Sequence, residues 1–445
     1  MDKLYDVIII GSGVVGNAIA REMSRYNLKI GVLEKELDVC NETSARNSGV
    51  LHAGFNNKPG TLMAKFCVEG NQGFDQVAKE LGVPFKRCGK LVVGFSEEDK
   101  EKLIAMKEQG KKNGVKGLEI IVKDKIKEIE PNIDSEFAMW SKTTGILNPF
   151  LLTIALAENA AANGAEYYFG NEVIDIKRVD DIYNIKTVKD TYKTRWVVNA
   201  AGLYSDKVSK MLGIDDYTIH PCRGEYFILD EKVGSKLSLP AYPVPNPKEG
   251  GLGIHLTPTI DGNVFIGPSS EYIDERDDYS ATQKIMDLLI KDGGRIFPHI
   301  RREDFIRNFA GIRPKLASKE EGGYHDFVIE MRDEAPNVIN LVGIESPGLT
   351  SSTPIAKYVV SLLKQKEELT ENENFNPIRK PIVTFNDKSV EEKEALIKEN
   401  PDYGEVICRC QTITKAEILE AINNPLGVET LTGIKYRCRA ISRRP

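Results

Sequence analysis

The stretch DVIIIGSGVVG, residues 6–16, joins a short apolar run to a glycine-rich turn. The run from Asp6 to Ile10 is typical of a strand that is buried on both faces. Beyond the turn, apolar residues at helical spacing predict a helix over 14–26, and a second buried strand over 29–33 leads to Glu34. This order of strand, glycine turn, helix and strand predicts a Rossmann-like βαβ unit that binds a dinucleotide.

Each glycine of the turn has its own task in such a unit. Gly11 makes the tight turn, Gly13 lets the backbone approach a pyrophosphate, and Gly16 allows the helix to pack closely on the sheet. Unpaired N–H groups at the start of the helix hold the phosphates, and an acidic residue after the second strand binds a ribose. The nucleotide-binding residues predicted here are Gly11, Gly13, Val14, Val15, Gly16, Glu34 and Lys35.

The next segment decides between NAD and FAD, which share this unit. Residues 42–49, ETSARNSG, place small hydrogen-bonding side chains around one arginine, and HAG follows at 52–54. This composition suits a backbone that runs along the ribityl chain and the edge of a flavin. We therefore predict FAD as the cofactor, and its further binding residues are Thr43, Ser44, Arg46, Asn47, Ser48 and Gly49.

Composition narrows the class of protein. The chain has 445 residues, 41% of them hydrophobic, which is enough to bury the cores of two or more domains. A formal net charge of −6 argues against nucleic acid as a partner. Seven cysteines without a signal peptide indicate a reducing cytoplasm. No apolar run reaches the roughly 18 to 20 residues that a transmembrane span requires.

The pattern of the chain changes between 220 and 270, where short strands alternate with turns rich in proline and glycine. This is typical of an antiparallel sheet. We therefore expect an α/β fold with a discontinuous FAD-binding domain, an antiparallel-sheet substrate domain and a small C-terminal module. The expected segments are 1–80, 145–215 and 325–365 for the first domain, 81–144 and 216–324 for the second, 366–402 for a linker and 403–445 for the module.

Several motifs outside the βαβ unit carry a family resemblance. SARNSGVLHAG at 44–54, VVNAAG at 197–202 and GIESPGLT at 343–350 resemble the FAD-dependent D-amino-acid-oxidase superfamily. KPGTL, KRCGKL, YPVP and GIHLT are similar to the branch that contains L-2-hydroxyglutarate dehydrogenases and anaerobic-type glycerol-3-phosphate dehydrogenases. The resemblance covers roughly 1–365 and implies a flavoenzyme, without fixing one substrate.

The resemblance also extends the cofactor site along the chain. It implies that Val173 lies against the adenine half of FAD, that residues 200–202 approach the nucleotide, and that 343–350 closes over the flavin. The helix that starts near Thr350 is then expected to stabilise the anionic reduced flavin through its dipole. The residues added in this way are Val173, Ala200, Ala201, Gly202, Gly343, Gly348, Leu349 and Thr350.

The chemistry that the resemblance implies is hydride transfer from a secondary alcohol to flavin N5. A histidine suits the task of accepting the hydroxyl proton, and His52 and His255 are the candidates because of their motifs. Arg313 is the expected third catalytic residue and forms an anion clamp with Lys315, which lies two residues further on. Arg223 is a weaker candidate for binding the substrate's anionic group, and Lys90 is expected to be structural.

The C-terminal segment starts like a known electron-transfer module. Cys408 and Cys410 in a C-x-C pair resemble the [2Fe–2S] domain that is fused to anaerobic-type glycerol-3-phosphate dehydrogenases. The second pair of that domain, spaced C-x-x-x-x-C, is missing, and Cys438 brings the number of thiols only to three. No histidine lies in residues 403–445 to complete a zinc site. We therefore predict a truncated module that holds no metal.

These features leave several functions open. The leading hypothesis is oxidation of a small anionic alcohol, glycerol-3-phosphate to dihydroxyacetone phosphate, with electrons passed to a protein partner. The nearest alternative is an L-2-hydroxyglutarate dehydrogenase, and an oxidase that uses oxygen directly is a third. A flavoprotein subunit that only relays electrons is the alternative from another class, and the combination of His52, His255 and Arg313 argues against it.

Overall fold

The computed structural model describes residues 3–245 and 253–440, so the end of the expected C-terminal module, 441–445, lies outside the described residues. The first of two large sheets has eight strands, and the predicted βαβ unit is at its centre. β1 pairs in parallel with β2 and β12, and β20 pairs in parallel with β12. Its strands are β1 (Leu4–Ile10), β2 (Ile30–Leu33), β9 (Glu166–Tyr168), β10 (Val173–Val179), β11 (Ile182–Thr187), β12 (Thr191–Asn199), β19 (Val328–Arg332) and β20 (Ala335–Val342).

Apolar residues on both faces of β1 explain why this strand is central. Val7 and Ile9 belong to one buried cluster, whereas Ile8 and Ile10 belong to another on the opposite face. The first face is covered by α1 (Val14–Met23), which packs against α5 (Pro149–Ala162) and α9 (Gly348–Leu363). α1 ends three residues earlier than the predicted helix, because the amides of Arg25 and Tyr26 bond the carbonyls three residues back, of Glu22 and Met23, and tighten the chain into a turn.

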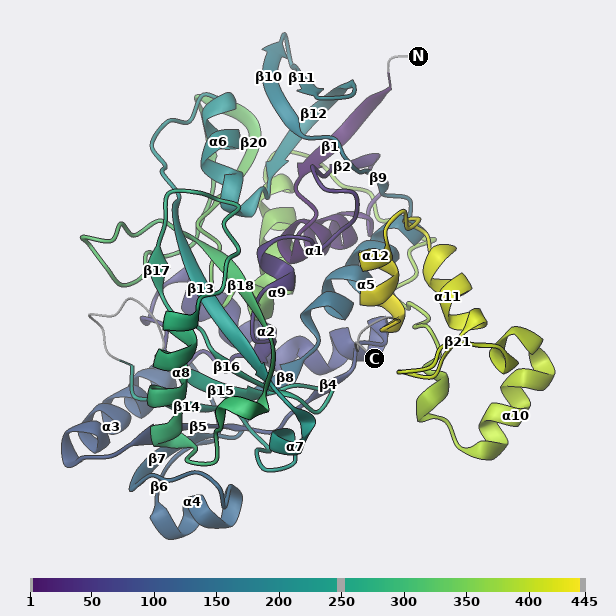
Figure 1. The fold of residues 1–445 in the computed structure, drawn as a ribbon. Coiled ribbons are helices and arrows are strands. Elements are labelled where there is room, and N and C mark those ends of the chain that lie inside the picture. Colours follow the sequence, from purple (N-terminus) through teal and green to yellow (C-terminus); the bar gives the residue numbers. More distant parts are fainter. Residues whose placement is uncertain (1–2, 246–252, 441–445) are drawn as a thin grey trace.

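The second sheet has nine strands, and most neighbours are antiparallel, as expected from the turn-rich segment (Figure 1). β13 and β18 form its longest ladder, in which Cys222 is opposite Arg313. Its strands are β5 (Lys90–Gly94), β6 (Leu118–Val122), β7 (Phe137–Ser141), β13 (His220–Leu229), β14 (Ala241–Pro243), β15 (His255–Pro258), β16 (Val264–Gly267), β17 (Glu271–Tyr272) and β18 (Phe305–Lys315). This sheet has its own apolar core, distinct from the core beneath α1.

The remaining elements connect or flank the two sheets. A small sheet contains β3 (Val50–Leu51), β4 (Phe85–Lys86) and β8 (Gly145–Leu147). The other helices of this part are α2 (Leu62–Leu81), α3 (Glu97–Lys112), α4 (Lys123–Ile129), α6 (Ser205–Met211), α7 (Glu231–Gly234) and α8 (Gln283–Ile296). No helix in the described part of the chain is long and apolar enough to cross a membrane.

The segment after α9 lies against the first sheet's helices. Arg25 and Asn27 of the turn after α1 bond the backbone of Asn372 and Thr370, and Arg379 Nε donates to Glu158 Oε2 at 2.5 Å. The expected linker is therefore packed along the fold for its first half. The C-terminal elements are α10 (Val390–Glu399), β21 (Val406–Cys408), β22 (Ile413–Thr414), α11 (Lys415–Ile422) and α12 (Leu431–Cys438).

Helix α12 holds the C-terminal elements against α5 (Figure 1). Arg437 is fully buried, and its guanidinium bonds Asp38 Oδ2 at 2.6 Å and Glu158 Oε1 at 3.3 Å. The rings of Tyr436 and Phe150 stack with centroids 4.2 Å apart. Because a buried guanidinium is costly without carboxylate partners, this contact fixes where the module docks.

Candidate active site

A long cavity runs between the two sheets, and it contains about 1340 Å³ of space, part of it open to solvent. One side is formed by the start of α1, the segment 43–52 and the start of α9. The opposite side is formed by β13, β14, β15 and β18 of the second sheet. The cavity therefore joins the predicted nucleotide turn to the strands that carry His255 and Arg313.

Backbone atoms pack directly against each other at the glycine turn. Gly11 has a φ of +105°, and a side chain there would place its Cβ 2.6 Å from the carbonyl oxygen of Ala200. A Cβ on Gly16 would lie 2.0 Å from the carbonyl oxygen of Gly11. Only glycine fits at either position, because these contacts are shorter than any real Cβ contact. α1 begins directly after Gly13, which provides no side-chain cap.

Glu34 ends the second strand of the unit in a buried position. Its Oε2 accepts from the Ser12 amide at 2.7 Å, and its Oε1 accepts from the Glu36 amide at 3.0 Å. Burial raises the pKa of this carboxyl to about 7. Lys35 points elsewhere, since its Nζ is 2.6 Å from Glu42 Oε1. Glu34 and Lys35 are both absent from the residues that line the cavity, and the Glu34 carboxyl bonds the backbone of the turn.

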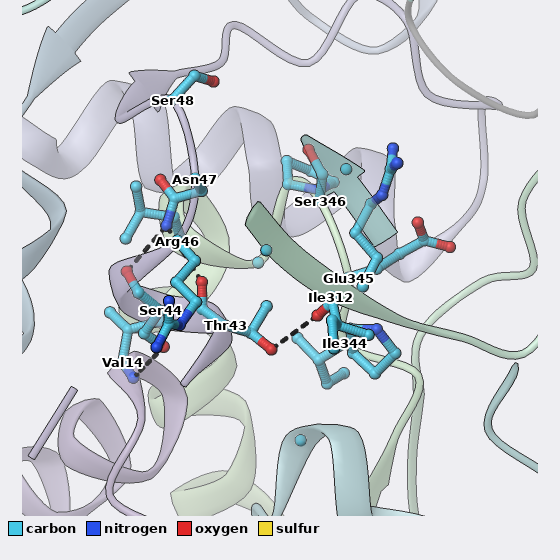
Figure 2. Close-up of a pocket in the computed structure, with 18 of the residues that line it drawn as sticks. Val14, Thr43, Ser44, Arg46, Asn47, Ser48, Ile312, Ile344, Glu345 and Ser346 are labelled. Carbon is cyan, nitrogen blue, oxygen red and sulfur yellow. Dashed lines mark hydrogen bonds between the residues drawn. The ribbon is translucent and has the colours of Figure 1, made fainter. Parts of the chain in front are cut away.

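The segment 43–52 is tied to both sides of the cavity (Figure 2). Thr43 Oγ1 donates to the Ile312 carbonyl of β18 at 2.9 Å, and Ser44 Oγ accepts from the Val14 amide at 2.9 Å. The His52 amide donates to Thr350 Oγ1 of α9 at 3.0 Å. These bonds hold the small residues of the motif along the cavity.

The predicted cofactor residues divide into two groups. Those that line the cavity are Gly13, Val14, Val15, Thr43, Ser44, Arg46, Asn47, Ser48, Ala200, Gly202, Gly348 and Leu349. The others are not among its lining residues, and they are Gly11, Gly16, Glu34, Lys35, Gly49, Val173, Ala201, Gly343 and Thr350. Gly11, Gly16 and Thr350 act by shaping the backbone behind the cavity, as their contacts show.

Buried polar atoms without partners test whether a flavin nucleotide suits the cavity. Arg46 lines the cavity, and its Nε is buried and lacks any hydrogen-bond partner, although buried polar groups are normally bonded. The helices α1 and α9 both begin at the cavity, which favours phosphate at one end and an electron-rich ring at the other. The residues present fit FAD, because its phosphates and flavin ring suit the two helix starts and it would offer acceptors to Arg46.

Both candidate histidines line this cavity. His255 Nδ1 is 2.9 Å from the Gly253 carbonyl, whereas its Nε2 is buried without a partner. Its ring stacks on Tyr242 with centroids 3.6 Å apart, and burial lowers its pKa to about 3. Burial, and to a lesser degree the nearby Lys90 ammonium, lowers the pKa of His52 well below its usual value. Both rings are therefore neutral at neutral pH, so each has one ring nitrogen that can accept a hydrogen bond.

Of the three candidate anion ligands, only Arg313 lines the cavity. Its Nη2 donates to the Ser269 carbonyl at 2.8 Å, and it forms no ion pair with a carboxylate of the described residues. Lys315 is fully buried behind it, with Nζ 3.3 Å from Glu345 Oε2. Arg223 bonds Glu271, Asp278 and Ser280. The expected Arg313–Lys315 clamp is thus not formed as predicted, because both Lys315 and Arg223 already have acidic partners.

The lining residues that were not predicted from the sequence include three tyrosines and a carboxylate, which are Tyr226, Tyr242, Tyr324 and Glu345. Tyr242 OH and the nearby Thr257 Oγ1 are buried without hydrogen-bond partners. Thr257 follows His255 by two positions on β15, so both residues project from the same face of the strand. Period-two alternation in the motif GIHLT was therefore a signal that could have identified Thr257.

The C-terminal thiols do not form a metal site among the described residues, where no group of three or more His, Cys, Asp or Glu side chains is arranged to hold an ion. Cys408 Sγ and Cys410 Sγ are 3.1 Å apart. Cys438 is buried in α12, where its thiol bonds the Ile434 carbonyl at 3.3 Å.

Comparison with known proteins places this architecture among flavoenzymes. A family model described as FAD dependent oxidoreductase matches residues 6–362. A glycerol 3-phosphate dehydrogenase of Caloramator mitchellensis is 42% identical over 440 residues, which are 98% of this chain and 90% of that protein. The human mitochondrial L-2-hydroxyglutarate dehydrogenase is 30% identical over 416 residues, covering 82% of this chain and 90% of that protein.

Among solved structures, the chain is similar to dithionite-reduced L-alpha-glycerophosphate oxidase from Mycoplasma pneumoniae, which has FAD bound. The TM-score is 0.79 and the identity 29%, over 85% of this chain and 98% of the oxidase. The matched region of the family model includes both sheets and the cavity between them.

Proposed function

The chain belongs to the family of FAD-dependent oxidoreductases, and on that premise we propose that it oxidises glycerol-3-phosphate to dihydroxyacetone phosphate. FAD is its cofactor. The wider class of substrate is a secondary alcohol that carries an anionic group. The similarity to a glycerol 3-phosphate dehydrogenase over nearly the whole chain supports this choice of alcohol.

The observation that carries the proposal is the surroundings of Arg313. Its guanidinium faces the cavity beside two neutral histidines and has no carboxylate partner among the described residues. A planar guanidinium binds phosphate or carboxylate with two parallel hydrogen bonds. Arg313 is therefore suited to hold the anionic end of an alcohol while its hydroxyl faces a base.

The chain's own residues orient the alcohol and take its proton. Arg313 holds the anionic group, and the unpaired OH of the lining residue Tyr242 is available to another polar group of the substrate. His52 or His255 accepts the hydroxyl proton at a ring nitrogen, since burial keeps both imidazoles neutral. FAD, when bound, would supply flavin N5 as the hydride acceptor for the carbon that carries the hydroxyl.

The division of labour we propose follows the two sheets. Segments 1–80, 145–215 and 325–365 bind FAD through the residues named above, and segments 81–144 and 216–324 bind the alcohol. The start of α9 lies at the cavity, and its dipole favours the negative charge of the reduced flavin.

We also propose that electrons leave to a protein partner and that residues 403–445 are a truncated iron–sulfur-type module without its own cluster. Support comes from the C-x-C pair and from the missing second pair of cysteines. No disulfide is formed among the described cysteines, which agrees with a reducing cytoplasm as the setting. Iron and sulfide analysis of the purified protein tests this point, and one cluster per chain would contradict it.

The test of the main proposal is anaerobic reduction of the bound flavin. The holoenzyme is mixed with glycerol-3-phosphate, L-2-hydroxyglutarate or L-lactate, and flavin absorbance is followed. We expect rapid bleaching with glycerol-3-phosphate and much slower bleaching with the two hydroxy acids. Bleaching by none of them, with flavin still reducible by dithionite, would favour a subunit that only relays electrons.

L-2-hydroxyglutarate is the second candidate substrate, and one observation favours it. Lys90 is a second buried cation without an acidic partner among the described residues, and it lies near His52. A dicarboxylate has two anionic groups, which two such cations are able to hold. Faster bleaching by L-2-hydroxyglutarate than by glycerol-3-phosphate would establish this alternative.

A further inference from the structure

A second cavity adjoins the first, and His52, Tyr324, Ser346 and Pro347 line both. It contains about 1190 Å³ of space, part of it open to solvent. The chain forms its walls with the segment 53–58, the first turns of α2, Lys90 of β5 and Gln109 of α3. Apart from His52, none of the predicted site residues faces this space.

Lys90 is the unusual group in this second cavity. Its side chain lines the cavity although the residue is only 3% exposed. Its Nζ lies 3.5 Å from the centroid of the Tyr242 ring and forms no hydrogen bond or ion pair with the described residues. Burial lowers its pKa to about 7. Burial without an anion disfavours the ammonium form, so an anion bound in the cavity would stabilise that form.

The neighbours of Lys90 do not provide that anion. The Cys67 thiol stays neutral because burial raises its pKa to about 12. The Asp326 carboxylate accepts from the Leu62 and Met63 amides, at 2.8 Å each. His325 and Lys58 also line this cavity, and as basic side chains they provide no anion.

Lys315 shows what a structural buried lysine looks like in the same protein. It is fully buried and also lies over an aromatic ring, that of Tyr324 at 4.2 Å. Unlike Lys90, it has a carboxylate partner, Glu345, at 3.3 Å. The two lysines differ in that Lys315 is paired with a carboxylate, whereas Lys90 has no such partner among the described residues and lines an open cavity.

We propose that the second cavity binds an anionic group, a phosphate or a carboxylate, through the ammonium of Lys90. The bound anion pairs with Lys90 in the same way that the Glu345 carboxylate pairs with Lys315. Two sources share this chemistry: the anionic end of the substrate, or a separate small anion. The inference rests on the proposed function only in taking His52 to stand beside the reacting carbon; the binding of the anion does not depend on turnover.

Calorimetric titration of the oxidised holoenzyme with sulfate and with glutarate tests this inference without any turnover. The variants are Lys90→Met, which keeps the length of the side chain, and Lys58→Met, which removes an exposed charge at the same cavity. We expect Lys90→Met to weaken anion binding about 10- to 100-fold, as for a lost charged hydrogen bond, and Lys58→Met to change it less than about twofold.

The pH dependence of sulfate binding by the unmodified protein is a second measurement that needs no variant. Sulfate does not titrate in this range, and His52, His255 and Cys67 stay neutral because of their shifted pKa values. The other ionisable side chains that line the cavity are Lys58, Tyr324, His325 and Asp326. Lys90 loses its proton as pH rises through about 7. Sulfate affinity is therefore expected to fall about tenfold per pH unit above that value.

The outcomes also separate the two sources of the anion. Competition between sulfate and substrate, with a raised substrate dissociation constant in Lys90→Met, identifies the group as the substrate's own. Sulfate binding without competition identifies a separate anion. Equal sulfate affinity in Lys90→Met and the unmodified protein, or affinity that does not change from pH 6.5 to 9, overturns the inference. Failure of every alcohol to bleach the flavin would count against the proposed function, while sulfate binding would still stand.

Discussion

The two sides of the main cavity are built in different ways. The nucleotide wall, which consists of the glycine turn, the start of α1 and residues 43–49, relies on backbone atoms and small side chains. The roof wall, which consists of the cavity-facing residues of β13, β14, β15 and β18, relies on long side chains such as His255 and Arg313. A ligand that is bound by backbone atoms requires glycines and small residues at fixed spacing along the chain. A ligand that is bound by side chains requires only that strands far apart in the sequence lie next to each other.

The nucleotide wall is expected to be the more sensitive to a single methyl group. In Gly16→Ala the new Cβ would lie 2.0 Å from the carbonyl oxygen of Gly11, so the turn and α1 must separate. We expect loss of bound FAD and a decrease of about 3 kcal/mol in the free energy of unfolding. Flavin content after purification and urea unfolding measure the two effects.

Gly73→Ala is the matched control, since Gly73 lies in the helix α2 and a Cβ added there would meet no atom within 4 Å. This change is expected to retain FAD and to stabilise the protein by about 0.5–1 kcal/mol, because alanine favours a helix. If Gly16→Ala kept its flavin, the close approach of helix and turn would not be required for binding.

This contrast explains how much of the molecule the sequence predicts. Glycines at fixed spacing between two buried strands predicted the unit around β1 and, with the segment 42–54, its cofactor. The antiparallel sheet was predicted from its turns, and His52, His255 and Arg313 were found because they lie in motifs. The chain places all three at one cavity.

The sequence does not show which carboxylate, if any, pairs with each arginine or lysine. Arg223 and Arg313 look alike in sequence, yet they lie on the paired strands β13 and β18 in opposite situations. Arg223 meets carboxylates from 271 and 278, and Lys315 meets Glu345 from 30 residues away. Such pairings depend on register and loop path, which a single sequence does not reveal. For the same reason Lys90 could not be recognised as unpaired.

Arg313→Met tests the roof wall directly. Removing one side of a buried, charged contact costs about 2–5 kcal/mol, so we expect kcat/KM for glycerol-3-phosphate to fall by roughly 30- to 5000-fold. Bound FAD is expected to remain, because Arg313 belongs to the opposite wall. Steady-state kinetics with a dye acceptor and flavin content are the measurements.

Arg223→Met is the comparison that sharpens this result. Its partners Glu271 and Asp278 are half exposed, so the change is expected to lower stability by about 1 kcal/mol and to leave the Michaelis constant nearly unchanged. A Michaelis constant raised as strongly as in Arg313→Met would return Arg223 to the substrate site.

The roof wall also makes stability depend on pH, through His255. Its pKa is about 3 in the folded protein, against about 6.5 when unfolded, so the unfolded chain binds the extra proton between these values. Stability is therefore present above pH 6.5 and is lost as pH falls. The loss expected from this residue is about 2 kcal/mol between pH 6.5 and pH 5. Urea unfolding of the unmodified protein and of His255→Gln at both pH values isolates it, and equal pH slopes would show that the ring is not buried and neutral.

The smallest expected effect concerns an atom that the folded chain leaves unpaired. Tyr242 OH is buried without a hydrogen-bond partner, so Tyr242→Phe is expected to change the free energy of unfolding by less than about 0.5 kcal/mol or to raise it slightly. The same change is expected to weaken substrate binding about three- to tenfold, as for one lost hydrogen bond. These two results together would show that the Tyr242 hydroxyl serves substrate binding and not the stability of the fold. Unchanged substrate affinity, measured by anaerobic flavin bleaching, would mean that the roof wall binds the alcohol through Arg313 and the histidines without this hydroxyl.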